Sequence, residues 1–135
     1  MRLMLDTNVC IYIIKQKPPE VLVRFNSYEV GDIAVSSITV AELQFGVRKS
    51  QQPERNQKAL DQFLLPLLVV DFDQIAAATY GEVRASLERQ GRPLGPLDML
   101  IAAHALSLKL TLVTNNVGEF ARVQGLVVEN WADRS

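Results

Sequence analysis

Short apolar runs recur along the chain and alternate with longer stretches in which apolar residues return every three or four positions. A short run of this kind is typical of a buried strand, and the longer spacing is typical of an amphipathic helix. The runs predict five strands, at residues 3–5, 33–35, 67–70, 111–113 and 126–128. Because the strands are apolar on both faces, both faces of their sheet are expected to be covered.

The stretches between the strands predict helices at about residues 7–15, 18–28, 39–49, 53–64, 74–90 and 96–108. Pro53 and Pro96 suit a first helical turn, where a backbone N–H has no helical partner. Asp73 can cap the helix that follows it, and Gly91 can end that helix. Strands that alternate with helices predict an α/β fold of three layers, with a short central parallel sheet flanked by helices.

Composition and charge narrow the class of protein. The 135 residues are expected to form one domain, residues 1–135, and the 48% of hydrophobic residues is ordinary for a globular chain. Fourteen basic and 15 acidic residues give a net charge of −1. That balance excludes binding of nucleic acid by bulk positive charge, but it does not exclude a nuclease that handles phosphate through a metal ion.

The chain has one cysteine and one histidine. Cys10 alone excludes a disulfide framework and a thiolate zinc site, fits a reducing compartment, and is interpreted as a small buried residue. His104 follows Asp98 by six helical positions and so faces another direction, which favours a packing role. No apolar run can span a bilayer and no signal peptide is evident, so a cytoplasmic protein without membrane contact is expected.

Acidic and amide side chains follow the strands of the predicted sheet. Asp6 comes directly after the first strand, and Glu42 is expected in the first turn of the helix after the second. Asp98 is expected in the first turn of the helix that begins at residue 96, and the segment after the fourth strand carries Asn116 and Glu119. Since ligands of parallel sheets bind outside the carboxyl ends of the strands, these side chains are expected at one site.

Crowded carboxylates without basic neighbours repel one another, and a divalent cation relieves that repulsion. Oxygen ligands without histidine or cysteine select a hard ion, Mg²⁺ or Mn²⁺. Such a site serves phosphoryl transfer or phosphodiester hydrolysis, in which the metal polarises the phosphate and stabilises the leaving oxygen.

Each of these residues also has a structural interpretation. Asp6 can cap the helix that follows it, and Asp98 near a helix start is favoured by the helix dipole. Thr39 and Glu42 have the S/T-x-x-E spacing of a capping box, which taken alone is the better interpretation of Glu42. Asn116 lies in a segment that can form a turn. The joint placement of these residues at one sheet edge favours the metal site.

Four motifs together resemble the PIN-domain ribonucleases and, among them, the VapC toxins of bacterial toxin–antitoxin modules. The motifs span nearly the whole chain: LDTN at residues 5–8, SITVAEL at 37–43, GPLDMLIAAHA at 95–105 and LVTNNVGEF at 112–120. The first motif is common by itself, whereas all four in this order and spacing are specific.

The resemblance implies that Asp6, Glu42 and Asp98 are the acidic residues of a metal site. Many PIN domains have a fourth acid at the position of Asn116, which puts a second metal in doubt here, and Glu119 is a plausible substitute. The resemblance further implies a Mg²⁺-dependent homodimeric endoribonuclease, with Mn²⁺ as a possible substitute. It would cleave structured RNA such as tRNA and be silenced by a cognate VapB-type antitoxin.

Other interpretations remain open from the residues alone. A haloacid-dehalogenase-like phosphatase would need a second aspartate where Asn8 stands, and a response-regulator receiver would need an acidic pair after the first strand. A non-catalytic protein-binding module, with the acids as helix caps, is the alternative from a different class; it should be indifferent to metal. Basic residues that can contact phosphate, or simply lie solvated at helix ends, are Lys15, Lys17, Arg48, Lys49, Arg55 and Arg92.

Overall fold

A computed structural model describes residues 1–132, and within them five parallel strands form one sheet. The strands are β1 (Leu3–Leu5), β2 (Ile33–Ser36), β3 (Leu68–Val70), β4 (Thr111–Val113) and β5 (Val128–Glu129). Their order across the sheet is β3-β2-β1-β4-β5. Strands β2 and β3 lie on one side of β1, and β4 and β5 lie on the other. The strand order therefore reverses between β1 and β4. Ligands of open parallel sheets bind at the carboxyl ends of the strands at such a point.

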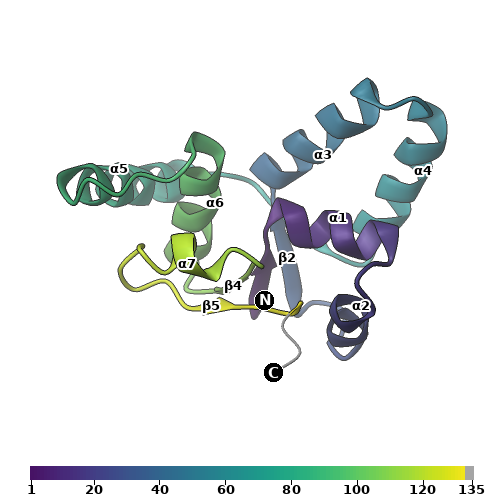
Figure 1. Cartoon of the computed structure of the whole chain (residues 1–135), viewed down its shortest axis with the longest axis horizontal. Helices are drawn as coiled ribbons and strands as arrows, with labels where there is room; N and C mark the ends of the chain where they lie inside the picture. The colour runs from purple at the N-terminus through teal and green to yellow at the C-terminus, as the bar shows by residue number, and fades with distance from the viewer. Residues whose placement is uncertain (133–135) are drawn as a thin grey trace.

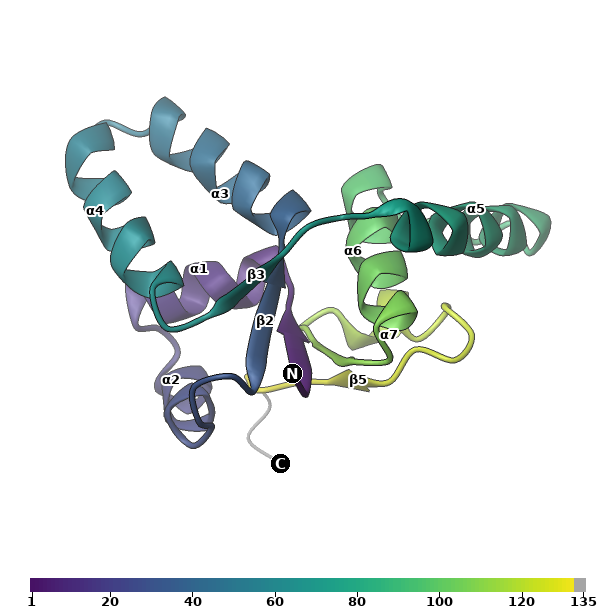
Figure 2. The same cartoon turned by 180° about the vertical axis from the view of Figure 1, so that it is seen from behind.

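Helices cover both faces of the sheet (Figures 1 and 2). They are α1 (Thr7–Lys15), α2 (Pro19–Asn26), α3 (Ser37–Lys49), α4 (Pro53–Leu64), α5 (Gln74–Arg89), α6 (Pro96–Ser107) and α7 (Val117–Phe120). The first four lie on one side of the molecule and the last three on the other. None of the helices in residues 1–132 has the length and apolar character needed to cross a membrane.

The alternation of side chains along β1 divides the core into two layers. Leu3 and Leu5 pack with α1 to α4 on one face, while Met4 packs with α5 to α7 on the other. All three side chains are buried, because helices cover both faces of the sheet at this central strand. The predicted three-layer α/β fold is confirmed.

Three elements differ from the sequence prediction. The strand β3 was expected to be buried on both faces, yet Leu68 and Val69 are 42% and 47% exposed because β3 is an edge strand. The last strand is shorter and later than predicted, at Val128–Glu129, and the short helix α7 was not predicted. The other boundaries agree within a few residues.

The start of α3 corrects the proposed capping box. The Ser36 hydroxyl accepts a hydrogen bond from the Ile38 N–H at 3.1 Å, so Ser36 is the N-cap and the helix begins at Ser37 rather than Thr39. Glu42 therefore lies in the second turn, beyond the N–H groups that a capping carboxylate can reach. Its carboxylate is free for another role.

A buried hydrogen bond joins the two helices that carry Glu42 and Asp98. The Nδ1 atom of His104 on α6 lies 2.8 Å from the Ser36 hydroxyl oxygen, and both residues are buried. The His104 ring also hydrogen-bonds the Asp71 backbone. In the tautomer that donates this bond from Nε2, Nδ1 accepts the hydrogen of the Ser36 hydroxyl. Burial lowers the pKa of His104, which keeps the ring neutral and able to accept. The prediction that His104 is a packing residue is confirmed.

Replacing Ser36 with alanine should destabilise the protein, because one change removes a helix cap and leaves the buried His104 nitrogen without a partner. We expect a loss of about 2–4 kcal/mol in the free energy of unfolding. Urea denaturation measures it. Ser107→Ala is the matched control, since Ser107 donates to the His104 carbonyl near the end of α6. That change should cost less than about 1 kcal/mol, and equal losses would contradict the double role of Ser36.

Candidate active site

Asp6 is held at the carboxyl end of β1 by two hydrogen bonds. Its Oδ1 atom accepts the Val9 N–H at 2.8 Å as the cap of α1, and the Thr114 hydroxyl donates to the same carboxylate. Only 4% of the residue is exposed. The pKa of Asp6 is raised to about 6, mainly by burial and in addition by the charges of Asp98 and Glu42, although the two hydrogen bonds act in the opposite direction. Asp6 therefore does act as a cap, but its electrostatic environment is that of a site residue.

Asp98 lies in the first turn of α6, as predicted, and is half-buried. Burial raises the pKa of its carboxyl, and the charges of Glu42 and Glu119 act in the same direction. A helix N-terminus normally stabilises an acidic side chain. Desolvation and the neighbouring carboxylates act against that stabilisation here.

Glu42 is oriented from a neighbouring helix. The Thr7 hydroxyl at the start of α1 donates to Glu42 Oε1 at 2.8 Å, and the Thr39 hydroxyl oxygen lies 3.3 Å from that of Thr7. Thr7 directly follows Asp6, so one short segment holds the first carboxylate and steers the second. The arrangement gives Glu42 a fixed place beside Asp6 rather than a capping role.

Asn116 and Glu119 lie together at the start of α7. The Asn116 side-chain amide donates to Glu119 Oε2 at 2.8 Å, while the Asn116 backbone N–H donates to the Thr114 hydroxyl oxygen at 2.9 Å. Asn116 therefore orients the carboxylate of Glu119, which is close enough to Asp98 to affect its pKa. Both candidates for the fourth position are found at the same edge of the sheet.

We refer to Asp6, Glu42, Asp98 and Glu119 as the acidic cluster. No ion pair within residues 1–132 involves the cluster, since the three that are present join Arg2 to Asp32, Arg24 to Glu129 and Arg84 to Glu88. Within the same residues, no three acidic, histidine or cysteine side chains converge closely enough to form a ready-made metal cage. The cluster is a set of neighbouring carboxylates rather than a closed site.

The donor set nevertheless fits a hard divalent ion. Its members are carboxylate oxygens, supplemented by the hydroxyls of Thr7 and Thr114 and the amide of Asn116. Oxygen ligands of this kind suit Mg²⁺ and Mn²⁺. A bound cation would also lower the pKa of Asp6, whose burial and like-charged neighbours now raise it.

Sequence reasoning did not single out the two threonines that position the acids. Thr7 and Thr114 each follow a strand directly or within one residue, and each donates to a carboxylate from a different segment. A threonine hydroxyl at the carboxyl end of a strand was the available signal. Cys10 is fully buried next to this region, as predicted, and burial raises the pKa of its thiol well above its usual range.

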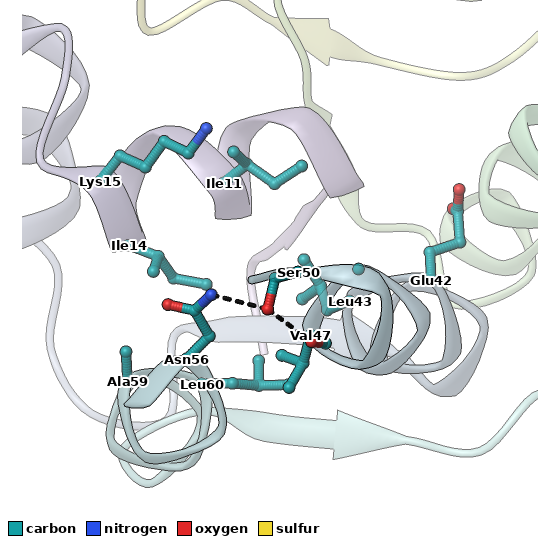
Figure 3. Close-up of a pocket in the computed structure, with 11 residues that line it drawn as sticks. Ile11, Ile14, Lys15, Glu42, Leu43, Val47, Ser50, Asn56, Ala59 and Leu60 are labelled. Atoms are coloured by element: carbon teal, nitrogen blue, oxygen red, sulfur yellow. Dashed lines mark hydrogen bonds between the residues drawn. The ribbon is translucent and has the colours of Figure 1, made fainter. Parts of the chain in front are cut away.

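A groove of about 350 Å³ runs between α1, α3 and α4, and it begins beside the acidic cluster (Figure 3). Glu42 stands at one end, and Asn56 near the other donates to the Ser50 hydroxyl at 2.9 Å. Its lining is otherwise mainly apolar: Ile11, Ile14, Lys15, Leu43, Gly46, Val47, Ala59 and Leu60. We call it the α1/α3/α4 groove.

The sequence of this chain matches known proteins over nearly its full length. The family model of the PIN domain matches residues 3–126. The tRNA(fMet)-specific endonuclease VapC of Shigella flexneri is 49% identical over 132 residues, which cover 98% of this chain and 99% of that protein. Ribonuclease VapC2 of Haemophilus influenzae is 49% identical over 131 residues, covering 97% and 98%.

Solved structures give the same result at the level of the fold. VapBC from Salmonella typhimurium, in a DNA-bound crystal structure, superposes with a TM-score of 0.92 at 46% identity, covering 97% of this chain and 98% of that one. VapBC2 from Rickettsia felis, bound to a DNA fragment from its promoter, superposes with a TM-score of 0.91 at 44% identity, covering 97% and 99%.

The buried charge of Asp6 should destabilise the metal-free protein at neutral pH. Because its folded pKa of about 6 exceeds the unfolded value of about 3.9, the folded state binds more protons between these pH values. The free energy of unfolding therefore falls as pH rises through that range. Asp6→Asn keeps the cap without the charge. In EDTA we expect it to stabilise the protein by about 1–2 kcal/mol at pH 7.5 and hardly at all at pH 4.

Asp73→Asn is the matched control, because Asp73 caps α5 through the Ala76 N–H at 2.9 Å but is exposed. Denaturation of both variants at the two pH values makes the comparison. A gain for Asp6→Asn that is equal at both pH values, or that Asp73→Asn reproduces, would show that burial of the Asp6 charge is not the cause.

Proposed function

The chain belongs to the PIN-domain family, and from the geometry of its acidic cluster we propose that it is a divalent-metal-dependent endoribonuclease toxin of the VapC type. Its proposed substrate is structured RNA, with tRNA foremost, because the Shigella flexneri relative is named as a tRNA endonuclease. Such a substrate would be met in the cytoplasm. We further propose that residues 1–135 act as one PIN-like domain.

The observation that carries this proposal is that four carboxylates from separate segments lie at the carboxyl edge of the sheet, near the point between β1 and β4 where the strand order reverses. Asp6 follows β1, Glu42 lies on α3, Asp98 on α6 and Glu119 on α7. Burial and, in addition, the charges of neighbouring carboxylates raise the pKa of Asp6 and Asp98, and no ion pair within the described residues involves the cluster. A fold that needed these residues only as caps would not collect them where they repel.

We propose that Asp6, Asp98 and Glu42 hold the metal, with Asn116 or Glu119 in the fourth position. When bound, a divalent ion supplies the positive charge that polarises the scissile phosphate and stabilises the leaving oxygen. Mg²⁺ is the proposed ion, and Mn²⁺ has the same preference for oxygen ligands.

The chain's own residues would contribute the positions of the carboxylates. Asp6 is fixed by Thr114 and the Val9 N–H, so it offers a carboxylate that needs no reorganisation. Thr7 limits Glu42 to the side that faces Asp6. Preorganised charge of this kind acts strongly where water is excluded.

We propose a VapB-type antitoxin as the protein partner and the α1/α3/α4 groove as the place where one of its apolar segments binds. Related structures are of VapBC toxin–antitoxin complexes. The groove is open, mainly apolar, and ends at Glu42, so an occupant would reach the acidic cluster. A homodimer is also proposed, and the exposed Leu68 and Val69 on the free edge of β3 offer it an apolar surface.

The alternative of a non-catalytic binding module is not favoured. It requires the acids to serve as helix caps, yet Glu42 caps no helix and instead accepts from Thr7. The relatives that match almost the whole chain are named as ribonucleases.

Cleavage should require the divalent ion and Asp98. We expect EDTA to abolish RNA cleavage and added Mg²⁺ or Mn²⁺ to restore it. Asp98→Asn should reduce kcat by about a hundredfold or more and weaken Mn²⁺ binding measured by calorimetry. Glu54→Gln is the control, since Glu54 also lies in the first turn of a helix but away from the cluster.

Glu42→Gln should lose most cleavage with a stability change below about 1 kcal/mol, because Glu42 is not a cap. Cleavage that persists in excess EDTA, or Asp98→Asn that cleaves like the wild type, would overturn the metal mechanism.

A side chain that fills the α1/α3/α4 groove should weaken antitoxin binding without reducing RNA cleavage. A Cβ at Gly46 would meet no atom within 4 Å, so Gly46→Leu should fold and place its side chain in the groove. We expect RNA cleavage to stay near wild type while affinity for the antitoxin encoded by the neighbouring reading frame falls about tenfold or more. Gly81→Leu on the exposed surface of α5 is the control. Unchanged antitoxin affinity in Gly46→Leu would place the partner elsewhere.

A further inference from the structure

Phe45 differs in its exposure to solvent from the other aromatic side chains of this protein. The chain has nine of them, and all fall within the described residues 1–132. The other eight are buried or half-buried, whereas Phe45 is 65% exposed. It lies on α3, three residues after Glu42. The one exposed aromatic ring therefore stands one helical turn from the acidic cluster.

A cation accompanies this ring. The Lys49 ammonium lies 5.2 Å from the centroid of the Phe45 ring, one turn further along α3, and its side chain is also exposed. Glu42, Phe45 and Lys49 have the spacing i, i+3 and i+7, which places them along one stripe of the helix. At 1.5 Å per residue, Phe45 lies about 4.5 Å and Lys49 about 10 Å along the axis from Glu42.

We propose that Phe45 and Lys49 form a subsite for the RNA strand next to the scissile phosphate, with an unstacked base on the Phe45 ring and a backbone phosphate on Lys49. The proposal rests on the ribonuclease function proposed above. At about 4.5 Å and about 10 Å along the axis from Glu42, Phe45 and Lys49 lie within reach of the nucleotides next to the scissile phosphate. An aromatic ring beside a cation is the usual arrangement for holding single-stranded nucleic acid without base-specific contacts.

Electrostatics favours RNA over a protein as the occupant. The acidic cluster repels phosphate, and the net charge of the chain is −1, so a strand needs local positive charge to approach. Lys49 and Arg48 provide it in the last turn of α3, the helix that carries Glu42. At about 100° per residue, Phe45 projects from the side of α3 opposite to Leu43 and Val47. These two residues line the α1/α3/α4 groove and Phe45 does not, so a partner in that groove would not cover the ring.

Tryptophan fluorescence can test the stacking directly. The chain has a single tryptophan, Trp131, which is 1% exposed and stacked on Tyr28, so its emission should not respond to RNA. Phe45→Trp adds an exposed reporter at the subsite. In an Asp98→Asn background, which stops cleavage, we expect saturable quenching by a short single-stranded oligoadenylate. Leu65→Trp, at a position that is 85% exposed at the end of α4, is the matched reporter and should not be quenched.

Kinetics and salt dependence test the two halves of the subsite. Phe45→Ala should raise KM about fivefold or more with kcat little changed, and Phe45→Trp should restore KM. Lys49→Gln should make the slope of log affinity against log salt shallower by about 0.7, the value for one contacted phosphate. Lys109→Gln, at the opposite edge of the sheet before β4, should leave the slope unchanged.

The outcomes separate this proposal from the proposed function. If Asp98→Asn is inactive but Phe45→Ala has the wild-type KM, or if Phe45→Trp shows no saturable quenching, the subsite is wrong and the ribonuclease stands. If Phe45→Ala changes the sedimentation coefficient or antitoxin affinity and leaves RNA affinity intact, the ring is a protein contact and the subsite is overturned. If Asp98→Asn cleaves like the wild type, the proposed function itself fails.

Discussion

Repulsion among carboxylates at the carboxyl edge of the sheet is the constraint to which the surrounding structure responds. Asp6 is buried, and its pKa rises to about 6 because desolvation and the charges of Asp98 and Glu42 disfavour the ionised form. No ion pair relieves the cluster within residues 1–132. Such an arrangement costs stability in the absence of a cation, so it persists only because the fold holds its members in place.

What holds them is a set of neutral hydrogen bonds between elements. The Ser36 hydroxyl ties the start of α3 to His104 on α6, and these two helices carry Glu42 and Asp98. The bond is buried, where an unpaired partner would be costly. Thr114 plays the corresponding part for Asp6 across the β1/β4 boundary. Neutral donors can hold like charges together without cancelling the charge that a metal ion requires.

Sequence patterns predicted the layers of the fold and the placement of Asp6 and Asp98, because strand ends and helix starts are encoded by short local signals. Glu42 was placed at the right edge but in the wrong turn. Ser36 and Thr39 are both acceptable helix caps, and only tertiary contact with His104 decides between them. The bond from Thr7 to Glu42 was not predictable either, because it joins helices whose packing angle no local pattern specifies.

Helix α3 carries parts of both proposed binding surfaces, one for the antitoxin and one for RNA. Successive residues of a helix are separated by about 100° around its axis. When α3 is viewed along its axis, Gly46 and Phe45 therefore lie on opposite sides of Glu42. Gly46 lines the α1/α3/α4 groove, and Phe45 lies outside it. An antitoxin segment and an RNA strand would thus occupy opposite flanks of one helix and meet only at Glu42. Inhibition would then act through the orientation of that carboxylate and access to it, rather than by competition along the whole RNA path.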